Sequence, residues 1–114
     1  MIEQTIYSTL GTLVSNRVYP LLMPQNPTFP AIVYTRVSIN PENRLEGGSS
    51  LDQIRFQIDT YAKTYAAVKS LAESVRSAME SASFKGTLQL EQDFYEPDLG
   101  LYQVTQDYYV WERN

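Results

Sequence analysis

The chain has 114 residues, which is enough for one domain with one modest hydrophobic core. It contains no cysteine and no histidine, which excludes disulfides, thiolate metal sites and the commonest catalytic base and zinc ligand. The formal net charge of −4 argues against a nucleic-acid binder, because phosphate binding depends on clustered Lys and Arg.

The N-terminal residues predict a helix that ends near Val14. Its apolar positions recur at helical spacing and form one inward-facing stripe: Ile2, Ile6, Leu10 and Leu13. The opening MIEQTIYSTL is acidic and amphipathic, so we do not expect it to be a signal peptide. No apolar run approaches the roughly 20 residues that a membrane-spanning helix needs. We therefore expect a protein that is made in the cytoplasm and has no membrane contact.

The middle of the chain predicts an extended arm followed by two strands. The segment SNRVYPLLMPQNPTFP holds four of the six prolines, which favours an extended arm with an edge strand at Arg17 to Tyr19. Ala31 to Ser38 is rich in β-branched and aromatic residues and predicts a strand. After the polar loop INPENRLEGGSS comes a second strand, in which Ile54, Phe56 and Ile58 alternate with polar residues.

The remainder predicts a helix and a final antiparallel pair, Thr87 to Tyr95 and Leu101 to Glu112, which begins after Gly86. Thr64 is the expected N-cap of the helix, whose apolar stripe is Val68, Leu71, Ala72, Val75 and Met79. This order of elements predicts an α+β fold over residues 1–114 as a single domain. We expect a two-layer sandwich with two helices packed on one face of a four- to five-stranded, mainly antiparallel sheet.

Strand alternation assigns the side chains of the sheet to two faces. Those expected to meet the helices in the last pair are Leu88, Leu90, Phe94, Tyr102, Val104, Tyr108 and Val110. The opposite face is expected to be polar and acidic, with Tyr109 and Trp111 towards one end. Its predicted acidic residues are Asp59, Glu91, Asp93 and Asp107. A solvated face accounts for this pattern without any function, and a surface that meets a partner is the alternative.

One carboxylate cluster is a candidate metal site. The segment DFYEPDLG places Asp93, Glu96 and Asp98 near a turn, where three carboxylates could hold Ca²⁺ or Mg²⁺. The spacing matches no metal-binding loop, and acidic residues beside Pro97 and Gly100 are ordinary turn formers. We therefore expect no metal site, no cofactor and no catalytic residue, so the protein is not predicted to be an enzyme.

Three segments follow one another in a distinctive order: RVYPLLMPQNPTFPAIVYTRVS, QIRFQIDTYAKTYAAVKSLAESVRSAM and YEPDLGLYQVTQDYYVWER. Together they resemble the tail completion or tail terminator family of long-tailed bacteriophages, prophages and gene transfer agents. The resemblance covers nearly the whole chain and depends on the order and spacing of the segments, because each motif alone is weakly specific.

The resemblance implies a structural virion protein without catalytic residues. Members of this family cap the finished tail tube as a ring, usually a hexamer, and present a docking surface to the head connector. The implied partners are further copies of the chain, the major tail tube protein and the head completion or connector protein, all at the head–tail joint. DNA would pass through the ring without specific binding. The alternatives are another head–tail joint or tail-tube component and a non-viral small ligand-binding domain.

A ring of this kind needs a lumen and contacts between subunits. The acidic face of Asp59, Glu91, Asp93 and Asp107 suits a lumen, because like charge keeps the phosphate backbone from binding. The loop from Asn40 to Ser50 is expected to reach a neighbouring subunit or the connector. Its candidate contact residues are Asn43, Arg44, Glu46, Gly47 and Gly48. The alternative is that this loop is a hairpin tip that contacts no partner.

Overall fold

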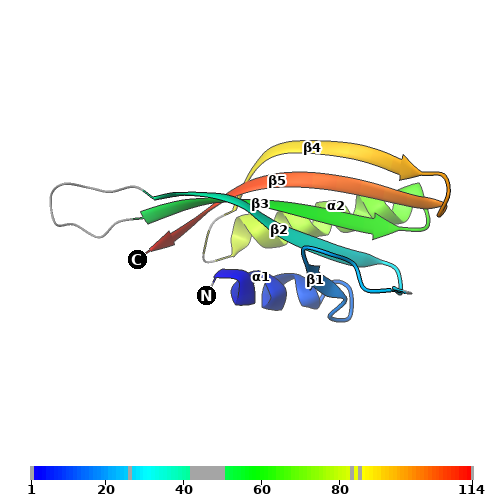
Figure 1. Ribbon diagram of the computed structural model, residues 1–114, viewed down its shortest axis with the longest axis horizontal. Coiled ribbons are helices and arrows are strands. Elements are labelled where there is room, and N and C mark those ends of the chain that lie inside the picture. The colour runs from blue at the N-terminus through cyan, green and yellow to red at the C-terminus, as the bar shows by residue number, and fades with distance from the viewer. Residues whose placement is uncertain (1, 26, 42–50, 83, 85, 114) are drawn as a thin grey trace, which may run out of the picture.

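The computed structural model describes residues 2–25, 27–41, 51–82, 84 and 86–113 of the chain. In chain order their elements are α1 (Ile2–Gly11), β1 (Val18–Pro20), β2 (Ala31–Pro41), β3 (Leu51–Ala62), α2 (Tyr65–Ser81), β4 (Thr87–Glu96) and β5 (Leu101–Arg113). Figure 1 shows the strands as one layer and the two helices as a second. Neither helix in this part of the chain is long and apolar enough to span a membrane.

The five strands form one sheet in the order β1-β2-β3-β5-β4. β1 runs parallel to β2, and every other neighbouring pair is antiparallel. The predicted α+β class, with a mainly antiparallel sheet and two helices, is therefore confirmed. The predicted edge strand in the proline-rich arm is also present, as the three residues of β1.

α1 ends at Gly11, about one turn before the predicted end near Val14. The backbone N–H of Asn16 donates to the carbonyl of Gly11 at 2.7 Å, and Asn16 takes a positive φ of 64°. Asparagine visits this left-handed region more readily than most residues, so it stabilises the turn that closes the helix. Val14 is still buried after the turn, together with Ile6 and Leu10.

α2 begins where the sequence predicts. Thr64 has the extended backbone of an N-cap, and its hydroxyl accepts a hydrogen bond from the backbone N–H of Ala67 at 3.1 Å. This bond satisfies a donor that the first helical turn would leave free. The predicted stripe is half-buried at Leu71 and fully buried at its other positions: Val68, Ala72, Val75 and Met79.

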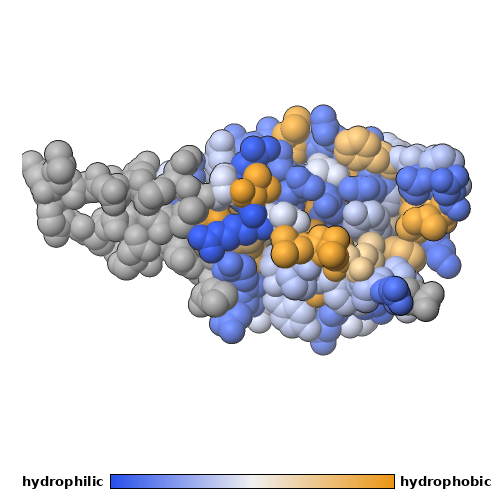
Figure 2. All heavy atoms as spheres, in the orientation of Figure 1, coloured by the Kyte–Doolittle hydropathy of each residue, from blue (hydrophilic) through white to orange (hydrophobic). Residues whose placement is uncertain are grey.

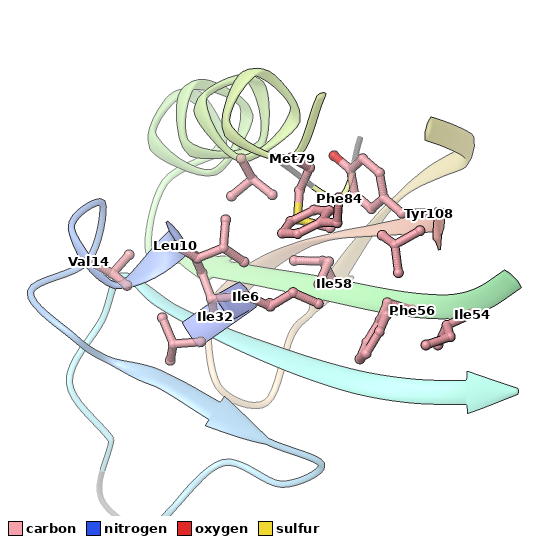
Figure 3. Close-up of a cluster of buried hydrophobic side chains, with 13 residues drawn as sticks. Ile6, Leu10, Val14, Ile32, Ile54, Phe56, Ile58, Met79, Phe84 and Tyr108 are labelled. Carbon is pink, nitrogen blue, oxygen red and sulfur yellow. The ribbon is translucent and has the colours of Figure 1, made fainter. Parts of the chain in front are cut away.

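The core lies between the two helices and the helix-facing side of the sheet. In Figure 3 the side chains of Ile6, Leu10 and Met79, which come from the helices, lie between the helices and the sheet together with side chains from the strands. The predicted alternation of β3 is confirmed, because Ile54, Phe56 and Ile58 have no exposed surface. Val104, Tyr108 and Val110 of β5 are buried as the sequence predicts, whereas the predicted Tyr102 is half-buried and Leu101, which was not predicted, is buried.

The predicted faces of β4 are wrong beyond Leu88. Leu88 pairs with Tyr108 and Leu90 with Asp107, so two steps along β4 correspond to one step along β5. This β-bulge reverses the alternation of β4 relative to its partner. Leu90 and Phe94 therefore lie away from the helices and are about half exposed, at 48% and 49%, in place of packing in the core.

Candidate assembly surface

The side of β3, β5 and β4 that faces away from the helices is the candidate surface, and we call it the open sheet face. The register pairs Arg55 with Tyr109, Gln57 with Asp107 and Asp59 with Thr105 along its centre. Its members are Gln53, Arg55, Gln57, Asp59, Tyr61, Leu90, Gln92, Phe94, Glu96, Gln103, Thr105, Asp107, Tyr109 and Trp111. In Figure 2 hydrophilic surface surrounds separated hydrophobic spots, including along the margin where β4 lies.

Two of the four predicted acidic residues, Asp59 and Asp107, share this face. Both are nearly buried, with 6% and 7% of their surface exposed. Arg55 donates to Oδ2 of Asp107 at 2.8 Å, and the amide of Gln57 donates to the two carboxylate oxygens of Asp59 at 3.2 and 3.1 Å. The hydrogen bond and the charge of Asp107 raise the pKa of the Arg55 guanidinium. Both carboxylates are therefore held by donors on the same face.

Asp107 keeps one unused acceptor. Its Oδ1 is buried and has no hydrogen-bond partner within the described part of the chain. Among the members named above, Arg55 is the one cationic residue, and Asp107 neutralises it. These members therefore offer no unpaired cation to an approaching phosphate.

The other two predicted residues, Glu91 and Asp93, lie on the opposite, helix-facing side, so the prediction that all four share a face is wrong. Lys69 of α2 lies 3.3 Å from a carboxylate oxygen of Glu91 and 3.2 Å from one of Asp93. The hydroxyl of Tyr65 also donates to Asp93, at 2.9 Å. We call these four residues the Lys69 cluster. It ties the edge strand β4 to the helix layer.

Sequence reasoning missed this arrangement because it assumed unbroken alternation along β4. The bulge between Leu88 and Leu90 contains no glycine or proline that could have marked it. The apolar spacing of Leu88, Leu90 and Phe94 instead imitates a regular buried strand. No signal in the sequence of β4 alone distinguishes a strand with a bulge from a regular buried strand.

A shallow hollow of about 450 Å³ lies at the β4 side of the open sheet face. Its lining combines glutamine and aromatic side chains: Gln57, Gln92, Phe94, Tyr95, Glu96, Gln103 and Thr105. The amide of Gln103 donates to the hydroxyl of Thr105 at 3.0 Å. The lining therefore combines hydrogen-bonding groups with one apolar wall.

The predicted carboxylate cluster is not assembled as a metal site. Asp93 is held by Lys69, while Glu96 accepts a hydrogen bond from the backbone N–H of Asp98 at 3.2 Å, within the turn after β4. Across the described residues, no three carboxylates come close enough together to hold a metal ion. The predicted contact loop, with Asn43, Arg44, Glu46, Gly47 and Gly48, lies outside the described residues and stays a prediction.

Comparison with known proteins finds a matching family model and a similar fold in solved structures. The family model described as "Tail completion protein gp17" matches residues 7–113. A chain in the solved structure "Virion of native gene transfer agent (GTA) particle" superposes with a TM-score of 0.65 at 13% identity, covering 96% of this chain and 92% of that chain. No curated protein matches the sequence.

Proposed function

Because the chain belongs to the family of the tail completion protein gp17, it is a structural protein of a phage-type tail, and we propose that it closes the tail tube and joins it to the head. In this proposal several copies, six by the family resemblance, form a ring on the end of the finished tube. The ring binds the major tail tube protein on one side and the head completion or connector protein on the other. Its location is then the head–tail joint.

The observation that carries this proposal is the extent of the family match. The family model covers residues 7–113, so it includes both helices and all five strands apart from the first residues of α1. The similar fold in a virion particle extends over nearly all of both chains. A likeness at 13% identity supports the fold, and the family match supports the role in the tail.

The open sheet face supports a second part of the proposal, that it lines the channel through which DNA passes. Among its named members Arg55 is the single cation and is paired with Asp107, while Asp59 adds a further negative charge. Four of its other members are glutamines with neutral side chains: Gln53, Gln57, Gln92 and Gln103. A surface of this kind has nothing that holds a phosphate backbone strongly, so DNA would slide past it.

The test uses particles that lack the gene for this protein. We expect full heads and tails that do not join, and we expect the purified protein to restore joining when it is added to the mixture. Electron microscopy of isolated tails with added protein should show a ring at one end of each tube. Normal joining without the protein would refute the proposal, and binding along the whole tube would favour the alternative of a tube component.

A further inference from the structure

β4 is an edge strand with one free side. Its neighbour in the sheet is β5, and the sheet order places no described strand beyond it. Every residue from Gln89 to Glu96 is exposed, and Figure 1 shows β4 at the outer margin of the sheet. The backbone N–H and C=O groups on its outer side are therefore available to another strand.

β4 lacks several of the features that prevent an edge strand from pairing with another chain. Natural edges are short or carry Pro, Lys, inward-pointing charges or strong bulges, and of these β4 has inward-pointing charges at Glu91 and Asp93, which share Lys69. β4 has ten residues, TLQLEQDFYE, with no proline, lysine or arginine. Its bulge lies at its start, so the stretch from Leu90 to Glu96 is regular. On this stretch Leu90 and Phe94 expose apolar surface on the open sheet face.

The opposite margin of the sheet is also open over part of its length. β1 pairs with β2 at three positions, from Ile32 to Tyr34. From Thr35 to Pro41, β2 has β3 on one side and no described strand on the other, with a β-bulge between Arg36 and Ser38 and a regular stretch after it. The sheet thus has two free margins, one formed by β4 and one by the second half of β2.

We infer that β4 of one copy pairs with the free half of β2, Thr35 to Pro41, of the next copy, so that the sheet continues from subunit to subunit. This inference rests on the ring proposed above. Two different surfaces of one chain make a head-to-tail contact, which is the kind that closes into a ring. Strand addition of this type derives its affinity from backbone hydrogen bonds.

The directions of the strands agree with this contact. β2, β3, β5 and β4 alternate in direction, so β2 and β4 of one copy run opposite to each other. Rotation about a ring axis that runs along the strands leaves their direction unchanged, so β4 of one copy and β2 of the next also run opposite to each other. The joint between copies would therefore be antiparallel, like the joints within each subunit.

Charged side chains lie on the same side of both margins. Arg36, within the free half of β2, pairs in register with the buried Phe56 and so lies on the helix-facing side, where it is partly exposed and forms an ion pair with Glu3 at 3.2 Å. On the same side of the other margin, Glu91 and Asp93 share one lysine and carry one excess negative charge. In a continuous sheet these groups fall on one face, so Arg36 of one copy would approach the carboxylates of the next.

The test is disulfide cross-linking of the full-length protein, which has no cysteine of its own. Thr35→Cys or Ser38→Cys on β2 is combined with Leu90→Cys, Gln92→Cys or Phe94→Cys on β4. β3 and β5 separate these margins by about 14 Å, three strand spacings, whereas a disulfide spans at most about 7 Å between Cα atoms. Any disulfide between the two positions must therefore join two copies.

The six double variants are oxidised after assembly on isolated tail tubes and analysed on non-reducing gels. We expect at least one combination to give a ladder of species that ends at the ring size. The matching single variants should remain monomers. Ser38→Cys combined with Ser74→Cys, an exposed position on α2, is the control and should give no ladder.

A second measurement uses Phe94→Lys, which places a charge on the exposed margin, and Leu99→Lys, which makes the same change in the turn after β4. Phe94→Lys should weaken ring formation at least tenfold without changing the thermal unfolding of the monomer, and Leu99→Lys should not. Efficient dimers from single β4 cysteines would overturn the inference in favour of β4–β4 pairing. Rings on tubes without any ladder would overturn it while leaving the proposed function standing, and absence of rings from the wild-type protein would refute both.

Discussion

The buried side-chain amide of Gln106 on β5 donates a 2.8 Å hydrogen bond to Oε1 of Glu91 on β4. The same amide donates to the carbonyl of Ala72 in α2 at 3.1 Å, and the carbonyl oxygen of Gln106 accepts from the hydroxyl of Tyr108 at 2.9 Å. One glutamine therefore connects β4, β5 and α2 at the place where the helix layer meets the edge strand. Burial raises the pKa of the Tyr108 hydroxyl, which stays a donor in this network.

We expect Gln106→Leu to lower the free energy of unfolding by about 1–3 kcal/mol, because it leaves the Tyr108 hydroxyl buried without its acceptor. Urea unfolding of the purified protein measures this change. Gln103→Leu, on the open sheet face of the same strand, is the matched control and should change stability by less than about 0.5 kcal/mol. Equal effects of the two variants would contradict the assigned role of Gln106.

Phe56→Ala should lower the free energy of unfolding by about 3–5 kcal/mol, because Phe56 is completely buried in the core. Phe94→Ala removes the same side chain from a half-exposed position and should cost less than about 1 kcal/mol. Thermal unfolding of the two variants compares them directly. A large effect at Phe94 would show that β4 keeps regular alternation and faces the helices.

The Lys69 cluster should make stability depend on alkaline pH. The hydrogen bond from Lys69 to Asp93 raises the pKa of Lys69, and the hydrogen bond from Tyr65 to Asp93 raises the pKa of Tyr65. A group whose pKa is higher in the folded state contributes stability that is present below its unfolded pKa and is lost as pH rises through the folded one. The contribution should therefore be complete at pH 8, begin to fall above about pH 10, where unfolded Lys and Tyr titrate, and disappear once the pH passes the raised folded pKa values.

This expectation is measured as the difference in unfolding free energy between the wild-type protein and Lys69→Met, first at pH 8 and then at pH 11. The difference should shrink at pH 11. Lys63→Met, which removes an exposed lysine outside the cluster, is the control for loss of a positive charge. A difference between wild type and Lys69→Met that does not change with pH would count against the cluster as a contributor to folding.

Added cations on the open sheet face should slow the release of DNA if that face lines the channel. We expect the double variant Gln57→Lys and Gln103→Lys to assemble normally, since both positions are only half-buried, and to slow ejection more strongly at low salt. Ser74→Lys with Ser77→Lys adds the same charge to the exposed side of α2 and serves as the control. Time-resolved ejection assays compare the two variants, and equal rates would refute the lumen proposal.

The sequence predicts well those features that depend on nearby residues. The Thr64 cap, the stripe of α2 and the alternation of β3 each follow from local spacing, and all three are confirmed. The positions of Asp59 and Asp107 follow from the same alternation. The hydrogen bonds that hold these two carboxylates depend on register between strands, which the sequence does not reveal.

The features that sequence reasoning missed depend on contacts between residues far apart in the sequence or on a single inserted residue. One bulge after Leu88 moved Glu91 and Asp93 to the helix-facing side and brought Leu90 and Phe94 to the other. A change of one residue in register reverses every later side chain of a strand, so a small local error becomes a large error in the predicted surface. The network around Gln106 joins residues up to 34 positions apart and has no local signature.

The ends of β2, β3 and β5 extend past both helices as a three-stranded ribbon, which Figure 1 shows at the side of the C-terminus. β3 and β5 remain paired there as far as Leu51 and Arg113, and β2 and β3 as far as Pro41 and Asp52. Without a helix above it, this ribbon depends on cross-strand contacts, so its amide hydrogens should exchange with solvent far sooner than those around Phe56. Local opening at this end requires no disruption of the core. The ends of β2, β3 and β5 can therefore change conformation during assembly while the core around Phe56 stays folded.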